Sequence, residues 1–126
     1  MQLTLKQILF LSQSDNYILR CEAVKTPNSP ISILEKLADD DNYFVRAHVA
    51  HNNTTPLKIL HHLCKDSEYV VRYSVVNNPN CSLALLKKML DDEESLITRT
   101  AKNYIECQKI VLDTLKKQVT NERQKK

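Results

Sequence analysis

The sequence predicts an all-α fold, an α-solenoid built from two-helix repeats with a period of 26 residues. The stretch YFVRAHVAHNNTTPLKILHHL, from Tyr43, returns 26 residues later as YVVRYSVVNNPNCSLALLKKM, from Tyr69. A fixed internal period is typical of repeat proteins, and the strand pattern L-x-x-L-x-L-x-x-N of leucine-rich repeats is missing. The same spacing aligns two apolar columns: Ile8, Leu34, Leu60, Leu86 and Leu112, then Leu11, Leu37, Leu63, Met89 and Leu115.

Each unit opens with a short amphipathic helix. In PISILEKLADD the residues Ile31, Leu34 and Leu37 follow one another at helical spacing and form an apolar stripe. Ser-Pro and Thr-Pro dipeptides mark the starts of two of these helices, because Pro lacks an N–H that would be unpaired there.

A second helix follows in each unit, as in NYFVRAHVAH. We expect Asp41 to cap this helix, Val45 and Val49 to face the core, and NNTTP to end it. Because neither short helix can bury its apolar stripe alone, neighbouring units must stack and share one core.

The period divides the chain into one helical-repeat domain over residues 1–117 and a polar, basic tail over 118–126. Nine helices and no sheet are expected. The junction at 103–108 reads NYIECQ and lacks the Pro or Gly that would end a helix, so the last two helices either separate or form one long helix. The units cover about 5–30, 31–56, 57–82 and 83–108, followed by a C-terminal capping helix over 109–117.

The order of Pro, Leu, Asp and Val-Arg within a unit resembles known helical repeats. TPLKILHHLCKDSEYVVRYSVV resembles HEAT-like repeats, and the arrangement NNTTP…L…L…D…VR…VxxN resembles the variant leucine-rich repeat more closely. The resemblance covers about residues 5–115 and implies a right-handed superhelix with the second helices on its concave side. The cysteine cluster that precedes some such arrays is absent, so no iron–sulfur role is carried over. The resemblance also implies a structural ladder between units, formed by Asp40, Arg46, Asp66, Arg72 and Asp92.

Composition limits the classes of function. The 126 residues carry a formal net charge of +3, and no apolar run approaches the roughly 20 residues that span a bilayer. Gly is absent, which excludes the glycine-rich loops of nucleotide-binding sites. The four cysteines stand singly, and His48 and His51, one helical turn apart, lack a third ligand for a metal. We therefore expect a cytoplasmic protein with no cofactor, no metal, no catalytic activity and no membrane contact.

Positions that vary between units are the candidate binding surface, because constant positions serve stacking. On the second helices, five variable positions are expected to point away from the inward Val45 and Val49, and they include Tyr and Arg, types enriched at binding hot spots. We call this set the second-helix face, and it predicts a non-catalytic protein–protein interaction scaffold. The face consists of Ala47, His51, Tyr73, Asn77 and Arg99.

The alternative function is nucleic-acid binding through the first helices. Their exposed face is basic in the middle of the chain, and the C-terminal tail adds positive charge. At the start of the chain, Leu9 and Phe10 replace charged residues on the same face, which predicts a contact with the chain's own end or with a second copy in a homo-oligomer. The residues of this basic stripe are Lys58, His61, His62, Lys87 and Lys88.

Overall fold

The computed structural model describes residues 2–125. Within this range the chain forms eight α-helices and one short 3-10 helix, and it contains no strand, which confirms the prediction of an all-α fold. The α-helices are α1 (Leu5–Ser12), α2 (Tyr17–Lys25), α3 (Ile31–Leu37), α4 (Tyr43–His51), α5 (Leu57–Leu63), α6 (Tyr69–Val76), α7 (Leu83–Lys88) and α8 (Ser95–Gln124), and the 3-10 helix η1 is Met89–Asp91.

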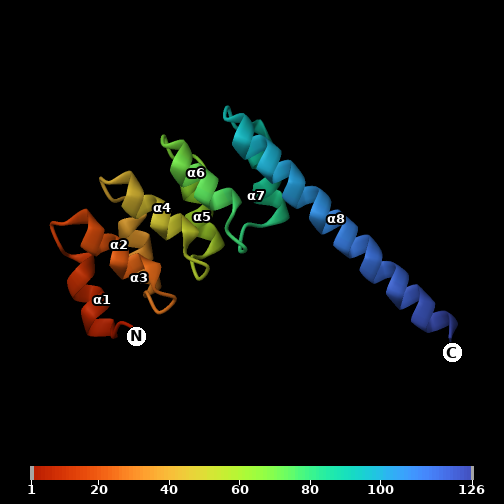
Figure 1. Cartoon of the computed structure of the whole chain (residues 1–126), viewed down its shortest axis with the longest axis horizontal. Helices are drawn as coiled ribbons and strands as arrows, with labels where there is room; N and C mark the ends of the chain where they lie inside the picture. The colour runs from red at the N-terminus through yellow and green to blue at the C-terminus, as the bar shows by residue number, and fades with distance from the viewer. Residues whose placement is uncertain (1, 126) are drawn as a thin grey trace.

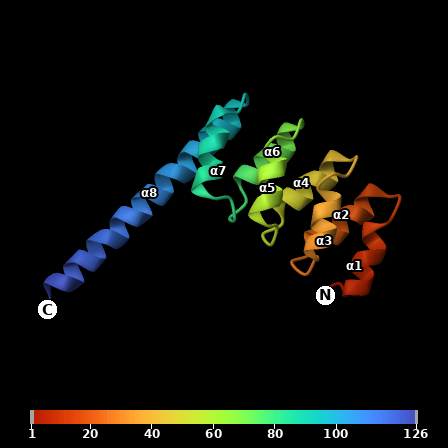
Figure 2. The same ribbon diagram turned by 180° about the vertical axis from the view of Figure 1, so that it is seen from behind.

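The helices are arranged in pairs that stand side by side in chain order (Figure 1). The pairs are α1 with α2, α3 with α4, α5 with α6, and α7 with the first part of α8. The second helices of the pairs form a row, in which α4 contacts α2 on one side and α6 on the other. The rest of α8 extends away from the pairs, so the C-terminal end of α8 lies far from α1 (Figure 2).

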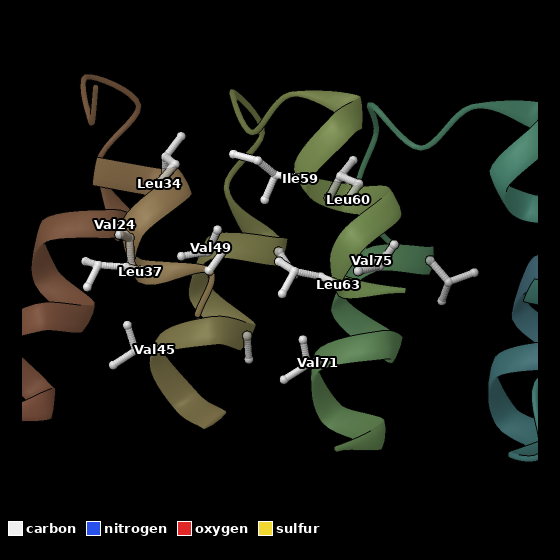
Figure 3. Close-up of a cluster of buried hydrophobic side chains, with 14 of the residues drawn as sticks. Val24, Leu34, Leu37, Val45, Val49, Ile59, Leu60, Leu63, Val71 and Val75 are labelled. Atoms are coloured by element: carbon white, nitrogen blue, oxygen red, sulfur yellow. The ribbon is translucent and has the colours of Figure 1, made fainter. Parts of the chain in front are cut away.

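The core consists of the apolar columns that recur at the 26-residue period (Figure 3). Ile8, Leu34 and Leu60 are fully buried, and Leu86 is nearly so. On the second helices, the predicted inward position of Val45 is likewise fully buried. Full burial of one such side chain stabilises the fold by about 1.5–3 kcal/mol.

Helix α4 is capped by Asn42 and not, as predicted, by Asp41. The Asn42 Oδ1 atom accepts a hydrogen bond from the Phe44 amide at 2.8 Å. Asn16 caps α2 in the same way, through the Ile18 amide at 2.9 Å. An Asn in extended backbone is suited to this position, because its short side chain reaches the free amide two residues further on.

The junction at 103–108 is helical, and α8 runs unbroken for 30 residues. Of the two outcomes open from the sequence, the single long helix is therefore the one that forms. Asn52 and Asn78 lie at the ends of the two preceding second helices, whereas Tyr104 occupies the equivalent position and lies inside α8. Because the junction has neither an Asn that turns the backbone at this position nor a Pro, the helix continues through it.

A separate capping helix over 109–117 is consequently not formed. Among residues 2–125 the last two of the nine predicted helices are one helix, which leaves eight α-helices. The apolar columns are buried only as far as the fourth unit, because Leu112 and Leu115 in the fifth have exposed fractions of 52% and 51%. Residues 118–124, set apart as a tail in the sequence analysis, continue α8 as helix.

Candidate protein-binding surfaces

Three arginines link consecutive units through carboxylates that lie twenty residues further along the chain. In every pair Nε donates to one carboxylate oxygen at 2.8 Å and Nη2 donates to the other, so the contact is bidentate. The pairs are Arg20 with Asp40, Arg46 with Asp66 and Arg72 with Asp92.

These pairs join into one continuous ladder. The backbone oxygen of Asp40 accepts a hydrogen bond from Arg46 Nη1 at 2.8 Å, and that of Asp66 accepts one from Arg72 Nη1 at 2.8 Å. For Asp66, burial raises the pKa, but the hydrogen bonds from Arg46 and from the Glu68 amide outweigh it and hold the pKa below its ordinary value. The ladder occupies the guanidinium groups, which leaves little donor capacity for a ligand.

A second ladder of buried asparagines runs along the opposite ends of the second helices. Asn52 Nδ2 donates to the backbone oxygens of Val24 at 2.8 Å and Thr26 at 3.0 Å. In the next unit, Asn78 Nδ2 donates to Ala50 at 2.7 Å and to Asn52 at 2.9 Å. The sequence analysis missed this role: the repeated Asn was the available signal, but its partners lie 26 and 28 residues away.

The second-helix face is only partly exposed. Ala47 is buried, with an exposed fraction of 7%, so its predicted outward position is wrong. The reason is that α4 packs against both α2 and α6, and these neighbours cover two sides of the helix in addition to the core side. Tyr73 is half-buried against the core, whereas His51 and Arg99 are exposed.

The fifth member of the face, Asn77, lies in a groove between the end of α6 and the middle of α8. The groove has a volume of about 450 Å³, and Val76, Cys107 and Val111 contribute to its largely apolar lining. Tyr104 Oη donates a hydrogen bond to Asn77 Oδ1 at 2.9 Å across the groove. Sequence reasoning did not single out Tyr104. The available signal was that Tyr104 occupies the position at which the two preceding units have Asn52 and Asn78.

The basic stripe is exposed but not purely basic. Lys58, Lys87 and Lys88 are exposed, and His61 is half-buried. The exposed His62 has Nε2 2.7 Å from Asp39 Oδ1, a carboxylate contributed by the preceding unit. The stripe therefore carries negative charge beside its histidines.

An exposed apolar surface on α1 and a partly buried histidine on α4 complete the candidates. At the N-terminal end, Leu5, Leu9 and Phe10 are exposed on α1, as expected for a contact surface. Burial, with the nearby Lys25 and His51, lowers the pKa of His48 on α4, which favours the neutral ring at pH 7.

Among residues 2–125, no group of three or more His, Cys, Asp or Glu side chains is placed to hold a metal ion. No helix in the part of the chain that the structure describes is long and apolar enough to cross a membrane. Comparison of the chain with protein-family models, with curated proteins and with solved structures returned no match.

Proposed function

We propose that this chain is a non-catalytic protein-binding scaffold, a right-handed α-solenoid of repeats related to the HEAT-like and variant leucine-rich types. The paired helices, the 26-residue period and the two inter-unit ladders support the solenoid. The free cysteines suit a reducing compartment, and we place the protein in the cytoplasm.

The α6–α8 groove is the single observation that carries the proposal. It combines an exposed aromatic ring, Tyr104, with apolar walls and with polar groups at Asn77, the mixture that binding hot spots prefer. The constant Arg, Asp and Asn residues are engaged in the ladders, so the residues left to distinguish a partner are those that vary between units. The binding surface therefore centres on Asn77 and Tyr104. Ala47 is buried, and Arg99 lies in a separate hollow beside Leu90 and Lys102, so neither is part of this surface.

The test is a pull-down from the native source followed by titration of the purified partner. Tyr104→Ala should weaken binding by about 1–2 kcal/mol, because its ring is exposed at the groove and truncation removes contact area. Lys36→Ala, on the outer face of α3, is the matched control and should leave affinity unchanged. Equal affinity for the parent, the Tyr104→Ala variant and the Lys36→Ala variant would refute the groove as the binding surface.

Nucleic-acid binding remains the rival function and is decided by a parallel measurement. If the basic stripe binds phosphates, retention on heparin or DNA falls steeply with salt and is lost when Lys58, Lys87 and Lys88 are replaced by Gln. Salt-insensitive retention, or retention that survives the triple replacement, leaves protein binding as the function.

A further inference from the structure

The distal part of α8 carries an apolar stripe with a seven-residue repeat. Ile105, Leu112 and Val119 recur at intervals of seven, and Leu115 lies between the last two. Ile105 is partly buried against the core. Leu112, Leu115 and Val119 have exposed fractions of 52%, 51% and 49%, so about half of each of these side chains faces solvent. A sustained seven-residue apolar repeat is the pattern by which one helix packs along another.

A row of basic residues follows one edge of this stripe at the same period. Its members share one flank of the helix, because a seven-residue step turns an α-helix by nearly two full turns. Structure supports the placement: Lys109 and Lys116 line one groove together with Leu112 and with Lys87 of α7, and Asp113 is the acidic residue in that lining. The row consists of Lys102, Lys109, Lys116 and Arg123.

We propose that this α8 stripe binds an amphipathic helix of a partner protein that carries Asp and Glu along one side of its own apolar stripe. The proposal rests on the protein-binding function above but uses a different edge of α8 from the Tyr104 groove. Apolar contacts would provide most of the binding energy, and the basic row would select an acidic partner and fix its direction along α8.

Charge argues against a second copy of this chain as the occupant. In an antiparallel pair of α8 stripes, the flank bearing Lys109, Lys116 and Arg123 would face the same flank of the other copy, which places like charges together. In a parallel pair that flank would face Tyr104, Val111 and Gln118, none of which is acidic. Neither arrangement neutralises the basic row.

Composition argues against a membrane surface. Helices that lie on membranes carry Trp, Phe or Leu on the apolar side and Lys or Arg across a strongly charged polar face. Helix α8 contains no Trp or Phe, its basic row follows one edge of the stripe, and Glu106, Asp113 and Glu122 are interspersed along it. An acidic protein helix meets the observed pattern better.

The experiment uses the full chain and two synthetic helical peptides of equal length. Both peptides have Leu at the core positions of three heptads, and the flanking positions are all Glu in one and all Lys in the other. Fluorescence anisotropy should show about tenfold or more tighter binding of the Glu peptide at low salt, and the difference should shrink as salt rises. Hydrogen exchange should show that the Glu peptide protects the amides of residues 108–124.

Variants at exposed positions assign the effect to the stripe. Lys109→Glu with Lys116→Glu should reverse the preference, so that the Lys peptide binds better. Lys117→Glu with Lys36→Glu, which changes net charge equally at exposed positions away from the stripe, should retain the original preference. Leu112→Gln with Leu115→Gln should abolish binding of both peptides while the circular dichroism of the array is unchanged.

Four results would overturn the proposal. They are no binding of the Glu peptide, equal binding of both peptides, a dimer in sedimentation equilibrium that the Leu112→Gln/Leu115→Gln variant dissociates, and binding of that stripe to phosphatidylglycerol vesicles in preference to the Glu peptide. Tyr104→Ala leaves the stripe intact, so this variant separates the two proposals. If Tyr104→Ala alone loses the partner found by pull-down, the inference about the stripe fails while the proposed protein-binding function stands.

Discussion

The Arg–Asp ladder predicts that the loss of one arginine costs more stability where the pair is more deeply buried. The side chains of Arg72 and Asp92 have exposed fractions of 8% and 7%, whereas Arg20 in the first pair has 18%. Arg72→Met keeps most of the aliphatic stem and removes the guanidinium. It leaves the Asp92 carboxylate with the Glu94 amide, at 2.9 Å, as its remaining hydrogen-bond donor.

The expected loss for Arg72→Met is about 3 kcal/mol, at the lower end of the range for an uncompensated buried charge, because the Glu94 amide remains. Arg20→Met should cost less, about 2 kcal/mol, since water reaches that pair more easily. Urea unfolding followed by circular dichroism at 222 nm measures both values, and the midpoint should move without a change in slope.

Lys25→Met is the matched control, because it also removes a cation that pairs with a carboxylate, here the half-exposed Glu22 at 3.0 Å. That exposed pair should contribute no more than about 0.5 kcal/mol. If Arg72→Met destabilises the protein no more than Lys25→Met does, the ladder does not hold the units together and the burial argument is wrong.

Three further outcomes are expected from other described groups. Asn78→Asp replaces a buried donor by an oxygen that faces two backbone oxygens, so it should cost about 2–4 kcal/mol in urea unfolding, and a loss below that of the exposed control Asn28→Asp would contradict the second ladder. Because the pKa of Asp66 is depressed in the folded state, its stabilising contribution is present above its ordinary pKa and is lost as the pH falls below about 4. Acid unfolding of Asp66→Asn should therefore be less steep than that of the parent, and parallel curves would refute the assignment. Partial burial raises the pKa of Cys81 to about 11, so iodoacetamide at about pH 8 should alkylate the exposed Cys107 and leave Cys81 unmodified in peptide mass spectra; equal modification would contradict the raised pKa.

The sequence by itself determined the helical class, the 26-residue period and the columns that fill the core. Ile8, Leu34, Leu60 and Leu86 could be aligned without a structure and are all buried. Such predictions succeed because periodicity within a helix and between repeats follows from local geometry, which the order of residues encodes directly. The resemblance suggested an Arg–Asp ladder from Asp40 to Asp92, and the structure pairs Arg46 with Asp66 and Arg72 with Asp92. The pair of Arg20 with Asp40 was not part of that prediction.

Only the tertiary structure decided which of the residues predicted to point outward are exposed to solvent. Ala47 lies on the outer arc of its helix by the 3.6-residue period, but the close approach of α2 and α6 to α4 buries it. Tyr104 forms part of the groove because the continuation of α8 brings its hydroxyl to Asn77, the residue that follows α6. The same continuation leaves Leu112 and Leu115 outside the core that their phase predicted. A repeat pattern specifies which faces of a unit are apolar, whereas the packing of neighbouring helices determines which of those faces is covered.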